Sequence, residues 1–464
     1  MWEQSENDLV ETEVVVVGAG YAGLAAALRL HDAGEDFAVV EAAGRVGGRT
    51  LSEVRSGSLT VDHGGQWVGP TQQQLLALAA RFDLGMFPTW ETGEHVEIWH
   101  DGRRVPYAGA APDTGPGIAG YQRVTELLDR LAQTVDTESP WLTPRFAEWD
   151  AQTAHTFFAA HTDDEDALRR LALAVQGVLC AEPYEVSLFH VLFSVASAGS
   201  FRELMETEGC AQDSRFLAGA DGPARAIAEL LGPRVRLGER VRSIERSPEL
   251  VRVRTASTTY EARRVIVALP PAAVRAIEFT PALPVERAGW LAHSPMGRVA
   301  KVHAVYDTPF WRAEGLSGIA TLYDDGPVGV VFDNSPADAS SGALVAFVYG
   351  DRLNDWSTRS VEQRRSAVLD ALARVVGPSA RWPADYAEKI WSLDGFVHGG
   401  YVAFAQPGAW LGYGRGGWRA PTGEVHWAGT ETASVWNGYI DGAISSGYRA
   451  AEEVLTALAA LPGG

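Results

Sequence analysis

Four consecutive valines at positions 14–17 run directly into the glycine-rich hexapeptide GAGYAG at positions 18–23, and the helix-forming stretch LAAALRL follows. An unbroken apolar run bounded in this way is typical of a buried parallel strand. Gly18 permits the tight turn, Gly20 lets the backbone approach a pyrophosphate at the helix N-terminus, and Gly23 allows the helix to pack closely on the strand. The segment therefore predicts the first strand-turn-helix unit of a dinucleotide-binding fold.

A second apolar run, FAVV, ends on Glu41, whose carboxylate would accept hydrogen bonds from a ribose. The following loop, AAGRVGGRT at positions 42–50, places two more glycines between Arg45 and Arg49. Glycine lets backbone amides point at a phosphate, and arginine adds charge-assisted hydrogen bonds. The loop resembles the RxGGRxxS/T motif of flavin-binding oxidoreductases of the glutathione reductase type, and it favours FAD over NAD.

The composition limits the setting in which the chain works. Its 464 residues exceed what one hydrophobic core usually organises, so we expect two domains. A formal charge of -20 disfavours nucleic acid and anionic membranes as partners. Cys180 and Cys210 are too few for a disulfide framework or a metal site, which fits a reducing cytoplasmic location. The chain start shows no signal-peptide pattern, and no apolar run reaches the ~18 residues of a membrane span.

The motifs divide the chain into interleaved parts of two domains. We expect an FAD-binding domain built from residues 1–85, 217–292 and 391–464, interrupted by a substrate domain built from residues 86–216 and 293–390. The first substrate segment is mostly helical in pattern. In the second, residues 298–306 and 342–350 are typical of strands, and residues 360–377 of an amphipathic helix.

The sequence resembles the flavin amine oxidases of the monoamine oxidase type nearly end to end. The stretches that carry the resemblance are GAGYAG, GRVGGRT, DHGGQWVGPTQ, AEPYEVS, LPPAAVRAIEFTPALP, MGRVAKVHAVYDTPFW, Trp391 and WAGTETASVWNGYIDGA. The resemblance implies an α/β fold in which a Rossmann-like FAD-binding domain of the glutathione reductase type is interleaved with an α+β substrate domain. It also implies the reaction: hydride transfer from the α-carbon of a neutral amine to flavin N5, hydrolysis of the imine to an aldehyde or ketone, and reoxidation of the flavin by O2 to give H2O2.

The family positions also imply which residues contact FAD. The Thr-Glu-Thr turn near the C-terminus looks like the family's last FAD-binding element, and Trp391 looks like a ring that packs on the flavin. The implied contacts are Gly18, Gly20, Tyr21, Ala22, Gly23, Glu41, Ala42, Arg45, Gly47, Gly48, Arg49, Gly65, Gln66, Trp67, Val241, Trp391, Gly429, Thr430, Glu431, Gly438, Tyr439, Ile440 and Ala443.

Four residues are expected to serve the substrate and the chemistry. Tyr401 and Tyr439 match two walls of the family's aromatic cage, whose ring faces attract an amine and exclude water. Gln212 matches a glutamine on the substrate side. Lys301 lies between apolar neighbours in a chain whose one other lysine is Lys389. A buried lysine must be paired or have its pKa lowered, unless it snorkels from a strand edge; in the family it holds a water against flavin N5.

Three departures from the family pattern refine the expectation. Gly400 stands where the mammalian enzymes attach FAD through a cysteine, so FAD should be bound non-covalently. The long C-terminal membrane tail of those enzymes is missing, which is typical of a soluble bacterial-type enzyme. Amino-acid oxidases place an arginine soon after the equivalent of GPTQ to clamp a carboxylate, and this chain has glutamine there. Amines without a carboxylate are therefore favoured, although an arginine from the helical segment could supply the clamp.

Other functions remain open at this level. The alternatives are an L-amino-acid oxidase, a biosynthetic flavin desaturase or dehydrogenase that passes electrons elsewhere, and a non-catalytic FAD-binding scaffold. The sequence does not disclose the amine. Phe189, Phe193 and Phe201 suggest an apolar pocket for aryl-alkyl or alicyclic amines, or else belong to the core. A homodimer, common in such folds, is left open.

Overall fold

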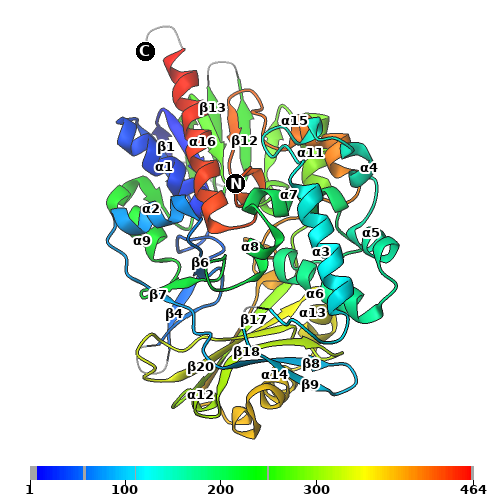
Figure 1. Cartoon of the computed structure of the whole chain (residues 1–464). Helices are drawn as coiled ribbons and strands as arrows, with labels where there is room; N and C mark the ends of the chain where they lie inside the picture. The colour runs from blue at the N-terminus through cyan, green and yellow to red at the C-terminus, as the bar shows by residue number, and fades with distance from the viewer. Residues whose placement is uncertain (1–7, 56–58, 110, 248–249, 461–464) are drawn as a thin grey trace.

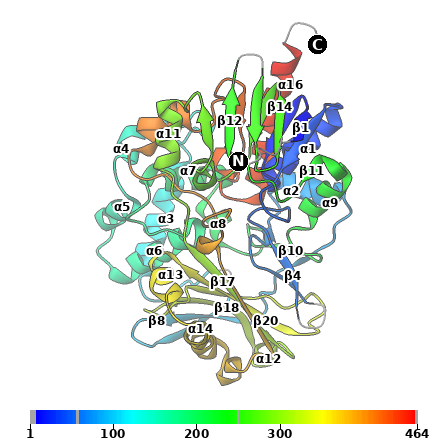
Figure 2. The same cartoon turned by 180° about the vertical axis from the view of Figure 1, so that it is seen from behind.

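The computed structural model of the chain describes residues 8–55, 59–109, 111–247 and 250–460 (Figure 1). The first seven residues, which contribute to the polar start of the chain, lie outside the described residues. In both views an upper part, which carries the C-terminal helix, sits on a lower part built around a large sheet (Figures 1 and 2). A group of helices flanks the two parts on one side.

A five-stranded parallel sheet forms the centre of the upper part. It combines β2 (Val14–Val17), β3 (Phe37–Val40), β11 (Val235–Arg236), β15 (Arg264–Val267) and β22 (Val425–Trp427) in the order β11-β3-β2-β15-β22. Val14 and Val16 pack with the helices α1 (Tyr21–Ala33), α9 (Gly222–Leu231) and α16 (Ile440–Ala459), whereas Val15 and Val17 pack on a second sheet. Burial on both faces explains why this strand is an unbroken valine run.

A second sheet of the upper part packs against the first. Its order is β1 (Asp8–Glu11), β14 (Thr258–Ala262), β13 (Val251–Arg254), β12 (Ser243–Arg246) and β16 (Glu278–Thr280). Smaller elements complete this part: the hairpin of β4 (Ser52–Val54) and β5 (Thr60–Asp62), the strands β6 (Trp67–Val68), β7 (Met86–Pro88) and β10 (Ser214–Phe216), and the helices α2 (Gln73–Arg81), α10 (Pro271–Val274), α11 (Val285–Ala292) and α15 (Arg415–Gly417).

A seven-stranded mixed sheet forms the lower part. Its order is β21 (Asp385–Ile390), β17 (Val299–Tyr306), β20 (Gly342–Tyr349), β19 (Val330–Asp333), β18 (Leu316–Tyr323), β8 (Glu94–Trp99) and β9 (Arg104–Tyr107). The helices α12 (Phe310–Ala313), α13 (Gly350–Ser357) and α14 (Val361–Val376) belong to it. Strands β17 and β20 and helix α14 were predicted, but β8 and β9 lie at the start of the segment whose pattern is mostly helical.

The flanking helices are α3 (Ile118–Ala132), α4 (Phe146–Asp150), α5 (Ala154–His161), α6 (Glu165–Leu179), α7 (Leu188–Ala198) and α8 (Phe201–Met205). Phe189, Phe193 and Phe201 belong to the hydrophobic core of this group, where Phe193 packs 5.0 Å from Trp410 between ring centroids. Of the two readings that the sequence left open for these phenylalanines, the core reading holds.

Strand β17 is buried on both faces of the lower sheet. Ala300 and Val302 pack in the same core as Leu369 and Leu372 of α14. Side chains alternate along a strand, so Lys301 and His303 face the opposite side, toward the upper part. Lys301 is only 1% exposed, which excludes snorkelling from a strand edge.

Candidate active site

The turn between β2 and α1 forms the first wall of a cradle. Gly18 has a φ of 103°, and a Cβ there would lie 2.8 Å from the carbonyl oxygen of Ala268. A Cβ on Gly23 would lie 1.8 Å from the carbonyl oxygen of Gly18, so glycine alone lets α1 approach β2 this closely. At the end of β3, Glu41 accepts a 2.7 Å hydrogen bond from the amide of Ala19, and burial raises the pKa of its carboxyl.

The second glycine loop lies against the first. Gly47 has a φ of 97°, and a Cβ on Gly48 would lie 3.1 Å from the Cα of Gly20. Arg45 donates hydrogen bonds of 2.8 Å to the carbonyl oxygens of Gly48 and Thr50. Its guanidinium therefore shapes the loop from behind, while the glycine backbone faces the cavity.

Glu431, in the predicted Thr-Glu-Thr turn, ties three separate segments together. Its carboxylate accepts two hydrogen bonds from Arg49, the longer of them 3.0 Å, and one of 3.1 Å from the amide of Ala403. Arg49 also donates to the carbonyl oxygen of Tyr401 at 2.9 Å, and the hydroxyl of Thr430 donates to the carbonyl oxygen of Tyr439 at 2.9 Å. The turn thus fixes the second glycine loop relative to both cage tyrosines.

One continuous cavity of about 380 Å³ joins these loops to the lower sheet. Side-chain-free glycines, the N-terminus of α1 and the acid at the end of β3 fit a dinucleotide, so the residues present suit FAD. Gly23, Arg45, Glu431 and Lys301 lie behind the cavity wall. The predicted FAD contacts that line it are Gly18, Gly20, Tyr21, Ala22, Glu41, Ala42, Gly47, Gly48, Arg49, Gly65, Gln66, Trp67, Val241, Trp391, Gly429, Thr430, Gly438, Tyr439, Ile440 and Ala443.

Lys301 extends toward this wall from strand β17 of the lower sheet. Its Nζ donates a 2.8 Å hydrogen bond to the carbonyl oxygen of Gly64 and a second one to Oε1 of Gln66. The same nitrogen lies 5.3 Å from the ring centroid of Trp67 and 5.4 Å from that of Phe347, and both rings line the cavity. Burial lowers the pKa of Lys301 to about 7, although the charge of Asp62 acts to raise it.

Tyr401 and Tyr439 both line the cavity at its FAD end. The peptide bond between Gly400 and Tyr401 is cis, and the Tyr401 hydroxyl donates a 3.2 Å hydrogen bond to the hydroxyl of Tyr349. The Tyr439 ring packs edge-on against Trp436 with centroids 4.9 Å apart. Burial raises the pKa of both cage phenols, so both stay uncharged around neutral pH.

Gln212 lines the same cavity with an unused acceptor. Its Nε2 donates a 3.1 Å hydrogen bond to the carbonyl oxygen of Leu204, which fixes the amide. Its Oε1 is buried and has no hydrogen-bond partner among the residues that the structure describes. A buried acceptor without a partner is costly, so this oxygen is suited to an N–H group of a ligand.

Three side chains on the floor of the cavity, Phe347, Val330 and Thr321, belong to one row that crosses the lower sheet from Lys301 to Glu97. The strand register pairs Lys301 with Phe347, Phe347 with Val330, Val330 with Thr321, and Thr321 with Glu97. Directly paired residues face the same side of a sheet, and neighbouring strands lie about 4.8 Å apart, so the row extends roughly 19 Å. The cavity therefore leads from Lys301 over an apolar stretch to the Glu97 end.

A buried ion pair closes that far end. Arg170 of α6, itself a lining residue, donates hydrogen bonds of 2.6 and 2.8 Å to the two carboxylate oxygens of Glu97 and one of 3.3 Å to the hydroxyl of Tyr323. The Arg170 and Glu97 side chains are 3% and 2% exposed. Of the other arginines along the described cavity wall, Arg49 is paired as above and Arg240 is exposed. The helical segment thus supplies an arginine, but it is already neutralised.

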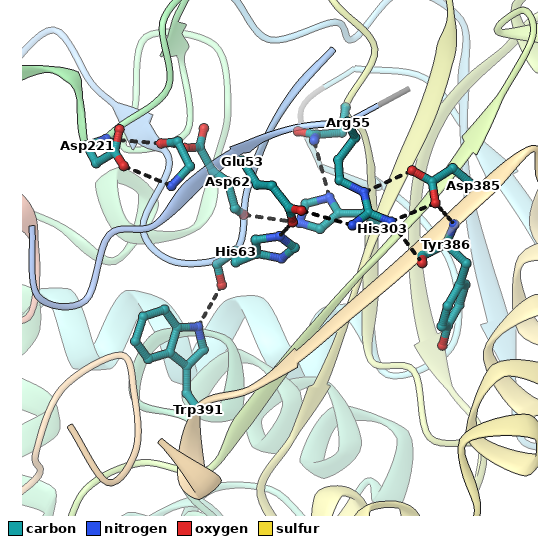
Figure 3. Close-up of polar contacts among 11 residues, drawn as sticks. Glu53, Arg55, Asp62, His63, Asp221, His303, Asp385, Tyr386 and Trp391 are labelled. Carbon is teal, nitrogen blue, oxygen red and sulfur yellow. Dashed lines mark hydrogen bonds and ion pairs between the residues drawn. The ribbon is translucent and has the colours of Figure 1, made fainter. Parts of the chain in front are cut away.

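Trp391 is held against the cavity from its outer side. Its Nε1 donates a 2.6 Å hydrogen bond to the carbonyl oxygen of His63, and the His63 ring bonds to Glu53 at 2.7 Å (Figure 3). On the same hairpin Arg55 donates to both carboxylate oxygens of Asp385, at 2.7 and 2.9 Å (Figure 3). Strand β21 and the Trp391 that follows it are therefore fastened to the FAD-side hairpin at two points.

Several residues of the site carry no motif that sequence reasoning could use. Tyr349 accepts from a cage tyrosine, and Glu97 and Arg170 close the cavity. For Tyr349 the local signal in the sequence is the alternation of Phe347 and Tyr349 in an apolar strand. The Glu97–Arg170 ion pair has no local signal, because its two residues are 73 positions apart.

The fold and the site together define a flavoprotein whose FAD cleft opens into a largely apolar cavity. The family described as flavin containing amine oxidoreductase matches residues 21–455. A Mycobacterium tuberculosis protein named as a flavin-containing monoamine oxidase, AofH, is 39% identical over 96% of this chain and 97% of its own length. The chain therefore belongs to the flavin-containing amine oxidoreductases, and it is an FAD-dependent amine oxidase.

Two solved structures are similar over the whole fold. Putrescine oxidase bound to putrescine has a TM-score of 0.92 and 33% identity, covering 97% of this chain and 100% of that one. Cyclohexylamine oxidase from Brevibacterium oxydans IH-35A has a TM-score of 0.92 and 32% identity, covering 97% and 99%. These likenesses and the neutralised arginines favour an amine oxidase over the L-amino-acid oxidase alternative. With no thiol at Gly400, binding of FAD is non-covalent.

In the described part of the chain no helix is both long and apolar enough to cross a membrane. The same residues contain no group of three or more histidines, cysteines or carboxylates placed to hold a metal ion.

Proposed function

We propose that this amine oxidase acts on an amine with an apolar body and no carboxylate, held between Tyr401 and Tyr439. The observation that carries the proposal is that both tyrosines and the free Oε1 of Gln212 face one cavity together with the loops that cradle FAD. FAD, when bound, supplies the acceptor for the hydride of the substrate's α-carbon and passes the electrons to O2.

The chain's own residues bind and orient the amine. The faces of two uncharged phenol rings attract the electropositive side of an amine and keep water out. Gln212 accepts a hydrogen bond from the amine nitrogen through Oε1, because its Nε2 is already committed to Leu204. Neither tyrosine acts as a base, since burial raises the pKa of both phenols.

Lys301 is proposed to take up and release a proton beside the FAD site. Its pKa of about 7 means that the charged and neutral forms are both populated at neutral pH. A lysine that gains and loses a proton near the working pH is suited to acid-base exchange with a neighbouring water.

The cavity lining supports an apolar substrate body. Beyond the cage much of the wall is formed by aliphatic and aromatic side chains, namely Leu173, Val178, Ile319, Val330, Phe332 and Phe347, although Glu91 and Glu206 also line the cavity. A substrate carboxylate there would be buried without a cation of its own, which is costly. Of the amines named for the two structural neighbours, cyclohexylamine suits the apolar side chains of this lining, whereas the second ammonium group of putrescine would need Glu91 or Glu206 as its partner.

Matched substrates test the proposal. The purified protein is mixed anaerobically with phenethylamine, cyclohexylamine, putrescine and phenylalanine, bleaching of the flavin absorbance is followed, and peroxide is assayed after air is admitted. We expect fast bleaching by the first two amines and peroxide on reoxidation. Faster bleaching by phenylalanine would refute the carboxylate argument, and bleaching that air does not reverse would favour a dehydrogenase.

A cytoplasmic location and a homodimer complete the proposal. Both cysteines, Cys180 and Cys210, are buried free thiols, which fits a reducing compartment. Light scattering of the purified protein tests the dimer: a mass near the 49.9 kDa of one chain would refute it.

A further inference from the structure

The two hydrogen-bond acceptors of Lys301 come from the loop that follows β5. The carbonyl oxygen of Gly64 is fixed by the backbone, but Oε1 of Gln66 belongs to a side-chain amide that could rotate. An amide presents an acceptor on one side and a donor on the other, so its orientation decides whether Lys301 meets an oxygen or an N–H group. What fixes Gln66 therefore also fixes Lys301.

A buried chain of amides sets the orientation of Gln66. Its Nε2 donates a 3.1 Å hydrogen bond to Oδ1 of Asn334, and Arg215 donates to the same oxygen at 2.5 Å. Arg215 can only donate, so Asn334 must turn its oxygen toward Arg215, and Gln66 must then turn its Nε2 toward Asn334. That leaves Oε1 of Gln66 for Lys301. Arg215 is anchored in turn by a 2.6 Å bond to the carbonyl oxygen of Ser335.

The hydrogen-bonded series from Gln66 through Asn334 to Arg215 is buried. Gln66 and Asn334 are each 1% exposed and Arg215 is 4% exposed. On its other side Nδ2 of Asn334 lies 3.5 Å from Nδ1 of His303, whose Nε2 is 3.1 Å from the carbonyl oxygen of Asp62 (Figure 3). Every polar side of the Asn334 amide thus has a partner, which excludes the flipped orientation.

We propose that Gln66 is a positioning residue for Lys301, and that the direction of its amide is dictated by Arg215 through Asn334. With Gly64 and Gln66 each accepting one N–H, a third position on Nζ stays free of both acceptors, and the Trp67 and Phe347 rings that line the cavity lie 5.3 and 5.4 Å from this nitrogen. In the ammonium form this position carries a proton, and in the neutral amine it carries the lone pair. The inference rests on the role proposed for Lys301 above, and it assigns Gln66 a function beyond FAD contact.

The charge of Gln66 matters as much as its direction. The charged or titratable groups that act on Lys301 are Asp62 from β5, His63 after it, Arg215 from β10 and His303 from β17. Lys389, its register partner on β21, is itself paired with Asp394 at 2.8 Å. A neutral amide at position 66 adds no second carboxylate to this set, and it leaves Lys301 free to lose its proton.

The scarcity of lysine makes the test direct. Because the chain contains two lysines, incorporation of lysine labelled with 13C at the ε-carbon gives two ε-signals in the FAD-bound protein, and Lys389 serves as the internal control. The 13C shift of each signal is followed against pH. In Gln66→Glu we expect the Lys301 titration to move up by about one to three pH units, because a carboxylate then adjoins the ammonium. In Gln66→Met it moves down, because one acceptor of the charged form is lost.

A matched substitution controls for added charge. Gln73→Glu makes the same chemical change at an exposed position seven residues along, and neither lysine signal should move. Asn334→Leu removes the amide that links Gln66 to Arg215. It should broaden the Lys301 signal or shift its titration in the same direction as Gln66→Met. If both Gln66 variants leave the Lys301 titration where it is, the inference is overturned.

Kinetics separate this inference from the proposed function. The pH dependence of flavin reoxidation should shift with the Lys301 titration in Gln66→Glu, and the shift should vanish in the double variant with Lys301→Met. If Lys301→Met alone leaves the oxygen reaction unchanged, the role proposed for Lys301 fails, whereas the NMR titrations still decide whether Gln66 positions it.

Discussion

Replacement of Arg170 by methionine tests the buried ion pair at the far end of the substrate cavity. Arg170 and Glu97 form a bidentate pair in which neither side chain is more than 3% exposed, and Arg170 also donates a 2.7 Å hydrogen bond to the carbonyl oxygen of Pro116. Methionine has a similar length and no charge. In Arg170→Met the Glu97 carboxylate keeps the Trp99 indole as a hydrogen-bond donor, at 3.2 Å.

The expected loss is large because one charge is left buried without its partner. Removing one member of a buried ion pair typically lowers the free energy of unfolding by about 3–5 kcal/mol. Glu97→Gln should cost a similar amount, since it strands the guanidinium. The double variant Glu97→Gln/Arg170→Met strands no charge, so we expect its loss to be well below the sum of the two single losses.

The two single variants should differ in their response to pH. A stranded carboxylate can take up a proton, so folded Arg170→Met binds one more proton than the unfolded chain, and its stability rises as the pH falls. Linkage limits this recovery to about 1.4 kcal/mol per pH unit. A stranded guanidinium does not lose its proton in this range, so the deficit of Glu97→Gln should persist at every pH.

Urea denaturation at pH 8 and pH 5.5, with saturating FAD and tryptophan fluorescence as the signal, measures these differences against the native chain. Equal deficits for Arg170→Met at the two pH values would refute the claim that an isolated buried carboxylate is formed. A loss below about 1 kcal/mol in both single variants would mean that water reaches the pair. Either result would also contradict the claim that Arg170 is unavailable to bind a substrate carboxylate.

Three further predictions concern the FAD end. Tyr439→Ala should raise KM and lower kcat while FAD absorbance is retained, and Tyr448→Ala on α16, the helix that follows Tyr439, is the control; unchanged kcat/KM would refute the cage. Glu431→Gln should raise the dissociation constant for FAD by at least about tenfold, because it strands Arg49 on the cavity wall and loosens the tie to Ala403; fluorescence titration of the apoprotein measures it. Acid precipitation should leave all yellow cofactor in the supernatant, and colour in the pellet would contradict the absence of a covalent link at Gly400.

The parts of the fold that the sequence predicts are those in which local pattern and burial coincide. The valine run of β2 is apolar throughout because helices cover one face and a second sheet covers the other. Strands β8 and β9 were not separated from the helical segment that follows them. Strand β8 pairs in parallel with β18, more than 200 residues later, and a pattern within six residues cannot show such a partner.

Some residues of the site could likewise be predicted from the sequence and others could not, because the second group is brought together by the register of the strands. Glycines and acids of the FAD cradle lie within motifs, so their positions in the chain are enough to predict them. Lys301 was predicted as buried because lysine is rare and its neighbours are apolar, but its acceptor Gln66 was assigned to FAD, since nothing in a sequence shows that residues 235 positions apart share a hydrogen bond. The row from Lys301 to Glu97 exists only once five strands are in register, because each strand contributes one side chain to it. A one-residue shift of any strand would turn that side chain to the opposite face, so the substrate cavity is specified by strand pairing and not by any motif.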